Sequence, residues 1–423
     1  MGKVSRRKFN RGLGAAAAVG TLAPTIVSAA KPKVVVVGGG FGGATAARYL
    51  KSFDHGIEVT LVEPSASFIT CPFSNIVIGG LKKMDFITHT FAGLPKAGVN
   101  VVQDWAIKVD GAKKTVTLRN GAALPFDRCI VSPGIDFQWE KVEGIGPQDV
   151  KRMPHAWKAG SQTILLRKQL EAMHNGGTFI ISPPVNPFRC PPGPGERISM
   201  VAHYFKEHKP KSKIVVLDPK QKFSKQGLFK EGWAKLYPGM IDYHNVDNDG
   251  VVQRVDVKNM TLQGDFDKYK GDVINFIPPQ QAGKIAQASG LADATGWCPV
   301  DHKTFESNLQ KDVHVIGDAS IAAPMPKSGF AASTQAKVCA AAVAKLLAGK
   351  MPGEPKFVNT CYSLVAPEYG ISVAMVYGYD NGKIFKVKGS GGLSPSGADD
   401  AFRQQEALYA EGWYKSIVSD IWG

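Results

Sequence analysis

Short β-branched runs alternate with helical stretches along most of the chain. The first run, K-V-V-V-V at residues 33–37, predicts a buried strand. A helical stretch follows at 44–52, and E-V-T-L-V-E at 58–63 predicts a second strand. The order strand, helix, strand is typical of a parallel α/β sheet, so an α/β fold is expected from the pattern alone.

The turn between the first strand and the helix is rich in glycine. Gly38, Gly40 and Gly43 have G-x-G-x-x-G spacing. Such glycines let the backbone approach a pyrophosphate, which the helix N-terminus attracts. Glu63 follows the last glycine by 20 residues, the position of an acid that holds ribose hydroxyls. We therefore expect a dinucleotide-binding unit; the alternative is a glycine-rich turn without a ligand.

A second strand–helix–strand pattern is predicted at 178–182, 196–208 and 213–218. Its connecting loop, P-P-V-N-P-F-R-C-P-P-G-P-G at 183–195, has six prolines and no G-x-G-x-x-G. Because proline has no N–H to offer a phosphate, NAD(P)H binding is not expected there. Cys190 stands just before the predicted helix, whose N-terminus is expected to lower the pKa of the thiol.

Two other segments favour FAD over NAD as the ligand of the first unit. Residues 311–319 predict a strand that ends in Gly-Asp. In flavoproteins with two dinucleotide-binding domains, the aspartate at that position, here Asp318, meets the ribityl chain of the flavin. Residues 126–134 resemble the strand and turn that end the first half of the same fold. For Asp318, a simple strand-end turn is the alternative.

The N-terminus has the features of an export signal. S-R-R-K-F at 5–9 is a twin-arginine pattern, and an apolar run at 13–27 and small residues at 28–30 follow it. We expect cleavage near residue 30 and a periplasmic protein that folds with its cofactor before export. The alternative is a basic, disordered tail. No apolar stretch in the rest of the chain is long enough to predict a transmembrane helix.

Charge and cysteine usage narrow the possible partners. The formal net charge is +15 at pH 7, and +10 without residues 1–29, which favours an acidic partner. No basic run is interleaved with aromatic residues, so nucleic acid is not expected. The six cysteines form no C-x-x-C-H motif, so any haem must sit on another chain. Cys129 and Cys339 are expected in the core, and a Cys298–Cys339 bond is left open.

The chain resembles the flavoprotein subunit of flavocytochrome c sulfide dehydrogenase over essentially its whole mature length. The segments that carry the resemblance are T-C-P-F-S-N-I-V-I-G-G (70–80), F-R-C-P-P-G-P-G-E-R (188–197), M-P-K-S-G-F (325–330) and N-T-C-Y-S-L (359–364). That family belongs to the flavin disulfide reductase group, beside sulfide:quinone oxidoreductases. The resemblance implies two dinucleotide-binding (Rossmann-like) domains of that type and a C-terminal interface domain.

The resemblance also implies how the chain is divided. The signal peptide is expected at 1–29 and the FAD-binding domain at 30–150 and 271–335. A degenerate NAD-binding-like domain that carries Cys190 is expected at 151–270. The interface domain, which carries Cys361, is expected at 336–423.

In the family, the cysteine of the first segment is bonded through sulfur to the 8α-methyl of FAD, and Cys71 matches it. The resemblance therefore implies a covalent flavin; a buried free cysteine is the alternative. Lys327 and Ser328 of the third segment are also expected at the cofactor. Pro72-Phe73 departs from the family pattern, which often has an aromatic residue or leucine after the cysteine.

The resemblance further implies that Cys190 and Cys361 form a redox-active disulfide beside the flavin ring. A bond that only joins two domains is the alternative. Glu196 matches a glutamate near this disulfide and is expected to carry protons; stabilisation by the helix dipole is the alternative. Gly195 replaces an aromatic residue that is common in relatives, so a more open pocket is expected.

The implied activity is oxidation of sulfide to zero-valent sulfur or polysulfide, with electrons passed to a separate c-type cytochrome subunit. The alternative is a sulfide:quinone oxidoreductase that acts at a membrane. Membrane docking is disfavoured by the acidic residues of the C-terminal tail, which are Asp399, Asp400, Glu406, Glu411 and Asp420. A second alternative is a protein that holds flavin and binds a partner but has lost turnover. A third is an NAD(P)H-dependent reductase, which the proline-rich loop disfavours.

Overall fold

The first predicted unit forms as expected from its hydrophobic pattern. The computed structural model describes residues 30–423, so the export signal predicted at 1–29 lies outside the described residues. β1 (Lys33–Val37), α2 (Phe41–Phe53) and β2 (Glu58–Val62) follow one another, and β1 pairs with β2 in parallel. The helix starts three residues before its predicted beginning at 44, because Gly42 and Gly43 already lie in its first turn.

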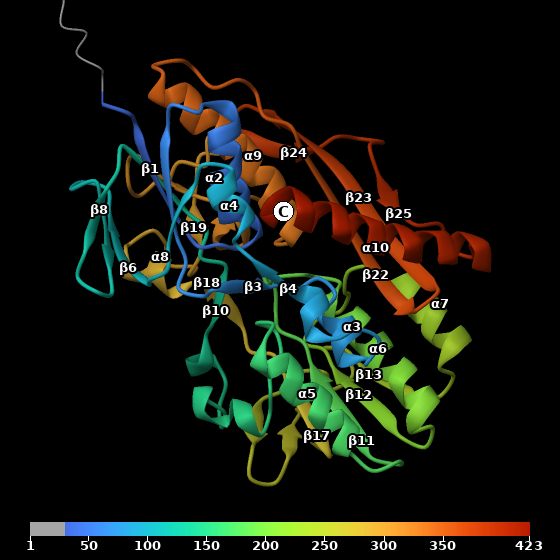
Figure 1. The fold of residues 1–423 in the computed structure, drawn as a ribbon. Coiled ribbons are helices and arrows are strands. Elements are labelled where there is room, and N and C mark those ends of the chain that lie inside the picture. The colour runs from blue at the N-terminus through green and yellow to red at the C-terminus, as the bar shows by residue number, and fades with distance from the viewer. Residues whose placement is uncertain (1–29) are drawn as a thin grey trace, which may run out of the picture. The chain divides into compact units, whose positions relative to one another are not determined.

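These strands belong to a five-stranded parallel sheet in the order β20-β9-β1-β2-β5. The other three strands are β5 (Asn100–Val102), β9 (Arg128–Val131) and β20 (Val313–Val315). The segments predicted at 126–134 and 311–319 therefore join the first unit side by side, although they lie far apart in the sequence. α2 packs against α9 (Gly329–Leu347), which crosses the boundary expected at residue 335 (Figure 1).

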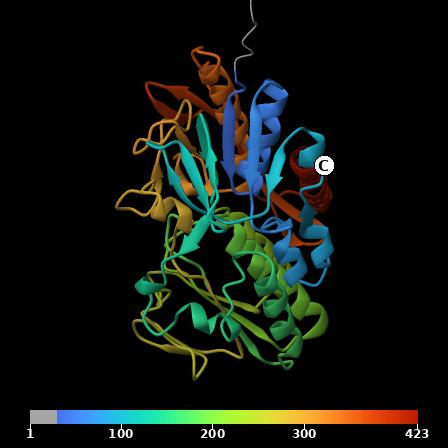
Figure 2. The same ribbon diagram turned by 60° about the vertical axis from the view of Figure 1, so that its left-hand side comes forward.

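A second parallel sheet has the order β13-β12-β11-β17. The predicted strands at 178–182 and 213–218 are β11 and β12, and α6 between them begins three residues before its predicted start at 196. β17 extends this sheet beyond the boundary expected at residue 270. Figure 2 shows the first sheet in the upper half of the view and the second sheet in the lower half. The elements of this part are β11 (Thr178–Ser182), α6 (Gly193–His208), β12 (Lys213–Leu217), β13 (Ile241–His244), β17 (Val273–Phe276), α5 (Ser161–Ala172) and α7 (Gln226–Leu236).

The C-terminal part is an antiparallel sheet with a long helix. It consists of β22 (Phe357–Ala366), β23 (Tyr369–Asp380), β24 (Lys383–Lys386), β25 (Gly392–Leu393) and α10 (Asp400–Trp422). Asp399 caps α10 by accepting the Phe402 N–H at 2.8 Å. At the other end of the helix, the Trp422 indole N–H donates to the carbonyl of Gly39 at 3.2 Å. The end of the chain therefore packs against the glycine-rich turn.

The remaining elements connect these three parts. The antiparallel pair of β10 and β18 links the two parallel sheets, and β3 pairs with β4 beside α3. These elements are β3 (Ser67–Ile69), α3 (Ser74–Ile78), η1 (Met84–Ile87), β4 (Thr88–Thr90), α4 (Gly93–Lys96), β6 (Ala106–Asp110), β7 (Thr115–Leu118), β8 (Ala123–Pro125), β10 (Ile135–Phe137), η2 (Trp139–Lys141), η3 (Pro147–Lys151), β14 (Arg254–Asp256), β15 (Thr261–Gln263), β16 (Lys268–Lys270), β18 (Gln280–Ala282), α8 (Lys284–Ala288), β19 (Cys298–Pro299), η4 (Gly317–Ala319) and β21 (Ser320–Ile321).

The core predictions for cysteine are confirmed. Cys129 in β9 and Cys339 in α9 are both fully buried. Cys298 is also buried, and burial raises the pKa of its thiol to about 12. All six cysteines of the chain lie within the described residues and have free thiols, so neither the Cys298–Cys339 bond nor the Cys190–Cys361 bond is formed in the structure.

Candidate functional site

One cavity of about 880 Å³ brings the predicted site residues together. Segments that are far apart in the chain line it: the glycine-rich turn, the loop after β3, the loop before α6, the region of η4 and strand β22. Nine of the eleven predicted residues line the cavity, namely Gly38, Gly40, Glu63, Cys71, Cys190, Glu196, Asp318, Ser328 and Cys361. Gly43 and Lys327 do not.

At one end of the cavity lies the dinucleotide turn. Gly38 has a φ of +98°, and a Cβ there would overlap the carbonyl oxygen of Ser132 on the neighbouring strand end. Gly43 does not line the cavity, and a Cβ there would overlap the carbonyl oxygen of Gly38. Gly43 therefore serves the close packing of α2 on the turn, whereas Gly38 and Gly40 face the ligand space.

Glu63 is fixed at the edge of this turn. One carboxylate oxygen accepts the backbone N–H of Gly39 at 2.8 Å, and the other accepts the backbone N–H of Ser65 at 3.0 Å. The side chain lines the cavity and has no basic partner among the hydrogen bonds and ion pairs of residues 30–423. It is therefore placed to accept hydrogen bonds from the ribose hydroxyls of a dinucleotide.

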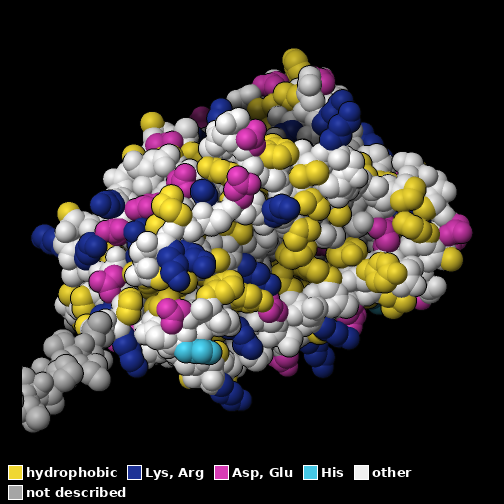
Figure 3. Space-filling model, turned by 90° about the horizontal axis from the view of Figure 1, so that it is seen from above, with side chains coloured by type: hydrophobic (Ala, Val, Ile, Leu, Met, Phe, Trp, Pro, Cys, Tyr) yellow, Lys and Arg dark blue, Asp and Glu magenta, His cyan; other side chains and the backbone are white. Residues whose placement is uncertain are grey.

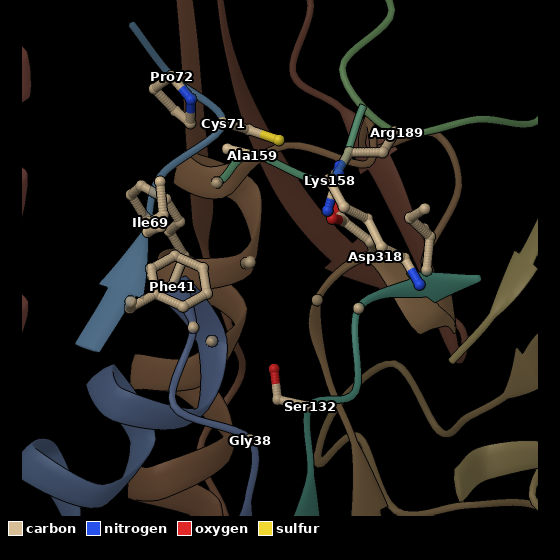
Figure 4. A pocket seen from close by; sticks show the side chains of 18 of the residues that line it. Gly38, Phe41, Ile69, Cys71, Pro72, Ser132, Lys158, Ala159, Arg189 and Asp318 are labelled. Atoms are coloured by element: carbon tan, nitrogen blue, oxygen red, sulfur yellow. The ribbon is translucent and has the colours of Figure 1, made fainter. Parts of the chain in front are cut away.

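Asp318 supplies an independent test of whether FAD fits this cavity. Its Oδ1 is buried and has no hydrogen-bond partner within the described residues, and burial raises the pKa of its carboxyl group. A buried oxygen that accepts no hydrogen bond costs free energy. A hydroxyl group of a bound ligand would supply the missing donor to Asp318. In Figure 4 the order along the cavity is Gly38, Asp318, Cys71, which matches the order pyrophosphate, ribityl chain and ring in FAD. The residues present therefore fit FAD.

Lys327 is not among the residues that line the cavity. Its ammonium group donates to the carbonyls of Asp318 and Ser320 at 2.8 and 2.9 Å and lies 3.8 Å from the centre of the Trp297 ring. Burial lowers its pKa to about 8. These contacts engage the ammonium group within the protein, and cofactor contact by Lys327 stays a prediction. The Lys327 carbonyl instead accepts the Cys190 N–H at 2.7 Å, so Lys327 supports the loop of that cysteine.

Ser328 lines the cavity, but its hydroxyl group is already used within the protein. Its Oγ caps α9 by accepting the Ala331 N–H at 3.1 Å. The same hydroxyl donates to Asn359 Oδ1 at 2.6 Å. Ser328 therefore joins the start of α9 to the strand that carries Cys361, and any cofactor contact made by Ser328 would come from the remaining surface of the residue.

Three thiols face the cavity from three separate segments. Cys71 follows β3, and its thiol donates to the carbonyl of Trp157 at 3.3 Å. Cys190 lies in the loop before α6 with a φ of +58°, and Cys361 lies within β22. The Cys361 sulfur accepts the side-chain amide of Asn359 at 3.3 Å. The fold thus brings Cys190 and Cys361, which are 171 residues apart in the sequence, to one cavity.

The expected effect of the helix on Cys190 is contradicted. Burial raises the pKa of the Cys190 thiol well above its usual range, and the neighbouring Cys361, Cys71 and Glu196 raise it further. Arg189 opposes this shift only in part. Desolvation outweighs the helix dipole because the dipole acts within the first turn, whereas Cys190 lies three residues before Gly193, where α6 begins.

Glu196 turns its carboxylate inward from the first turn of α6. One oxygen accepts the Asn75 amide at 2.8 Å, and the other accepts the Leu364 N–H at 3.0 Å, three residues beyond Cys361. Burial raises the pKa of this carboxyl group, and the two hydrogen bonds oppose the rise. A carboxyl group with a raised pKa beside two thiols is suited to proton transfer, which favours the first of the two interpretations of Glu196.

Two charged residues that enclose the cysteines were not expected from the sequence. Arg197 is 1% exposed, and its guanidinium donates to the carbonyls of His155 and Ala156 and to Asn275. Arg189 lines the cavity, donates to the carbonyl of Trp157, and has a buried Nε without a partner among residues 30–423. Arg189 precedes Cys190 and Arg197 follows Glu196 in the sequence. Their position beside predicted site residues was the only sequence signal for them.

The second unit does not present a free acid at the end of its strand. Asp218 follows β12 as Glu63 follows β2, but its Oδ1 pairs with the Lys220 ammonium at 2.6 Å. Its other oxygen accepts the Tyr243 hydroxyl at 2.9 Å. Lys220 also donates to the carbonyl of Pro184 in the proline-rich loop at 2.8 Å. The position at which a nucleotide ribose would bind is therefore occupied by the protein's own side chains.

The fold and the cavity define a flavoprotein of the pyridine nucleotide–disulfide oxidoreductase class, and the family model described as "Pyridine nucleotide-disulphide oxidoreductase" matches residues 32–160. Residues 163–278 match "Sulfide dehydrogenase (flavocytochrome c) flavoprotein chain, central", and residues 353–422 match "Flavocytochrome c sulphide dehydrogenase, flavin-binding". The chain belongs to the family of flavocytochrome c sulfide dehydrogenase flavoprotein chains, which confirms the resemblance seen in the sequence.

Similar proteins are found in two groups. The sulfide dehydrogenase (flavocytochrome c) flavoprotein chain of Chlorobaculum thiosulfatiphilum is 67% identical over 45 residues, which are 11% of this chain and 94% of that sequence. The mitochondrial sulfide:quinone oxidoreductase of Dictyostelium discoideum is 24% identical over 72% of this chain and 69% of its own length. The structure of sulfide:quinone oxidoreductase from Aquifex aeolicus shares the fold, with a TM-score of 0.70, 15% identity and 92% of each chain covered.

Proposed function

We propose that this chain is the flavoprotein subunit of a sulfide dehydrogenase that oxidises sulfide to zero-valent sulfur or polysulfide and passes the electrons to a c-type cytochrome subunit. One observation supports this most directly. Cys71, Cys190 and Cys361 line one cavity together with the dinucleotide turn and the unpartnered carboxylate oxygen of Asp318. A flavin site and a pair of thiols in one cavity are the parts that a sulfur-to-flavin electron transfer needs.

The first chemical step is a thiol–disulfide exchange at the oxidised Cys190–Cys361 pair. Hydrosulfide attacks one sulfur, which becomes a persulfide, and the S–S bond breaks so that the other sulfur leaves as a thiolate. Glu196 stands between the loop of Cys190 and the strand of Cys361, where it can take up the persulfide proton. Bound FAD would supply the two-electron oxidant that can release its electrons singly.

Cys71 is proposed to hold the flavin covalently. The comparisons support an FAD-binding protein, and Cys71 lies at the end of the cavity opposite the glycine-rich turn, where the flavin ring would be (Figure 4). We expect flavin to remain with the chain after denaturation and precipitation, and to be released from Cys71→Ser. Release of all flavin from the denatured wild-type protein would contradict the thioether, although it would leave the flavin site in place.

The cysteine pair is tested by anaerobic reduction with sulfide. Sulfide should bleach the flavin absorbance of the native protein, and Cys190→Ser or Cys361→Ser should slow this about a hundredfold or more, because the exchange needs both sulfurs. Cys339→Ala removes a buried thiol of α9 outside the cavity and should keep the wild-type rate. Bleaching by NADH but not by sulfide would exclude the proposed donor and favour a reductase instead.

A sulfide:quinone oxidoreductase is the second candidate, because relatives with that name align over 72% of this chain. Within residues 30–423, none of the helices combines the length and apolar character that a bilayer crossing needs. Figure 3 shows Lys and Arg side chains spread among Asp and Glu on the face in view. Comparing reduced-flavin reoxidation by cytochrome c with that by a soluble quinone distinguishes the two acceptors, and vesicle flotation tests membrane docking.

Export to the periplasm by the twin-arginine route is part of the same proposal and rests on residues 1–29 of the sequence. The twin-arginine pattern supports a protein that folds around its flavin before it crosses the membrane. Replacement of Arg6 and Arg7 by lysine should leave the protein in the cytoplasm, as cell fractionation would show.

A further inference from the structure

Lys225 is a buried lysine directly behind the cysteine pair. It is 4% exposed and stands at the start of α7 with a φ of +62°. Its ammonium group donates to the carbonyl of Cys361 at 2.9 Å, to Ser363 Oγ at 2.8 Å and to the carbonyl of Ile371 at 3.3 Å. A lysine of the part that carries Cys190 thus holds β22 and β23 at the level of Cys361.

Within the part of the chain that the structure describes, the hydrogen bonds of Lys225 leave its charge without a direct counter-ion. All three acceptors are neutral oxygens, and burial lowers the pKa of Lys225 to about 8. An unpaired buried ammonium group is unfavourable, so it is retained only where another charge compensates it at some stage. The cavity residues that face it and favour its charged form are Cys361, Glu196 and Cys190, in that order of influence, with Glu406 of α10 next.

We propose that Lys225 is a positioning residue for sulfide oxidation: its ammonium group fixes Cys361 beside Cys190 and stabilises the thiolate that forms at Cys361 when their bond opens. This inference rests on the proposed function for its role in turnover. Its chemical content, a lysine-dependent thiolate at Cys361, does not depend on the identity of the donor. The Asn359 amide, which already donates to the Cys361 sulfur, supports the same thiolate.

Two other hydrogen bonds to β22 serve as a comparison for the Lys225 contact. Glu196 accepts the Leu364 N–H, and the Tyr237 hydroxyl donates to the carbonyl of Val365 at 2.7 Å, so residues of α6 and of the two ends of α7 hold β22 at three points. Only the Lys225 contact brings a positive charge, and only that contact ends at Cys361 itself. Loss of the charge should therefore change the chemistry of Cys361 more than its position.

The test is the alkylation rate of Cys361 in the fully reduced holoprotein, measured with iodoacetamide and mass spectrometry across pH. Iodoacetamide reacts with the thiolate, so the rate at neutral pH reports the thiolate fraction. Lys225→Met and Lys225→Gln should each lower the rate at Cys361 about tenfold, because each removes the positive charge that favours the thiolate. Glutamine keeps a donor for the Cys361 carbonyl and separates loss of charge from loss of the hydrogen bond. Lys225→Arg keeps the charge and should restore most of the rate.

Lys220→Met is the matched control, because Lys220 is a buried lysine of the same part of the chain that has its own carboxylate partner, Asp218. It should leave the Cys361 rate unchanged. Equal rates and equal pH dependence in the wild type and in Lys225→Gln would overturn the inference, as would a loss in Lys225→Arg as large as in Lys225→Gln. Because alkylation needs no sulfide turnover, a lysine-dependent rate in a protein that sulfide fails to bleach would keep this inference and reject the proposed donor.

Discussion

The two strand–helix–strand units have the same topology and opposite chemistry. β1–α2–β2 and β11–α6–β12 each place a helix between two parallel strands of five residues. The first unit turns from strand to helix through glycines that leave a cavity next to the helix start. The second turns through a loop of six prolines that places Cys190 in the left-handed region and directs it into that same cavity.

The acids at the ends of the second strands differ in the same way. Among residues 30–423, Glu63 is held only by backbone N–H groups, whereas Asp218 is paired with Lys220 and Tyr243. Parallel topology therefore does not by itself confer dinucleotide binding. A glycine-rich turn and an acid without a basic partner among the described residues are what the first unit has and the second lacks, and the second unit has a proline-rich loop with a thiol in their place.

The largest expected effect comes from adding a side chain in the glycine-rich turn between β1 and α2. Gly43→Ala would place a Cβ on the carbonyl oxygen of Gly38, which is backbone and cannot move aside without shifting α2. We expect a destabilisation of about 3 kcal/mol or more and loss of bound flavin. Denaturant unfolding and the ratio of flavin to protein are the measurements. Gly227→Ala in α7, where a Cβ meets nothing within 4 Å, is the control and should change stability by no more than about 1 kcal/mol. Wild-type flavin content and midpoint in Gly43→Ala would show that the close approach is not required.

The second prediction removes the ion pair between Asp218 and Lys220 in the second unit. Asp218→Asn leaves the buried Lys220 ammonium without its charge partner, which should destabilise the protein by about 3 kcal/mol, while flavin content stays unchanged. Combining it with Lys220→Met removes the stranded charge and should recover most of the loss. A double-variant cycle in urea measures this coupling. A gain of NADH binding in Asp218→Asn would support the view that internal side chains fill the nucleotide site of the second unit. A loss of flavin would show that the second unit affects flavin binding at the first.

The alternation of strands and helices was enough to predict both units and their parallel pairing, with helix starts misplaced by three residues. The glycine-rich turn, Glu63 and Asp318 were also predictable, because short sequence patterns with a known mechanism mark them. The three-part architecture came from family resemblance. The pattern could not show that β17 completes the second sheet or that α9 crosses a proposed boundary, since both depend on long-range packing.

Long-range contacts also explain what was missed in the site. The pKa of Cys190 was expected to fall from its position before a helix, but burial, which a local pattern does not reveal, raises it. Lys327 was predicted at the cofactor from its segment, but its contacts with Trp297 and two carbonyls could not be predicted from that segment. Lys225 had no sequence signal, because its partners on β22 and β23 are 136 to 146 residues away in the chain.

The third prediction tests the free acid of the first unit. Glu63→Gln removes a charged acceptor of the Gly39 and Ser65 N–H groups and of the expected ribose hydroxyls. Flavin affinity should weaken about tenfold, in line with a charged hydrogen bond of about 1.5 kcal/mol. The Cys71→Ser background is required so that flavin binding is reversible and a dissociation constant can be measured by fluorescence. Asp218→Asn in the same background should keep the affinity; an equal loss in both variants would remove the distinction between the two acids.

The smallest expected effect concerns the start of α6, where the second unit has Glu196 instead of a phosphate site. Burial raises the pKa of this carboxyl group in the folded protein, so the folded state binds a proton more readily than the unfolded state. Its contribution to stability is therefore full below the unfolded value of about 4.3 and is lost as the pH rises through the folded pKa. Relative to Glu196→Gln, the wild type should gain stability on acidification from about pH 7 toward about pH 4.5, because the folded state takes up the proton more readily. Urea unfolding at several pH values measures the difference, with Glu207→Gln, an exposed glutamate on the same helix, as the control. Parallel pH profiles for the wild type and Glu196→Gln would mean that Glu196 remains ionised and is held by the Asn75 and Leu364 hydrogen bonds alone.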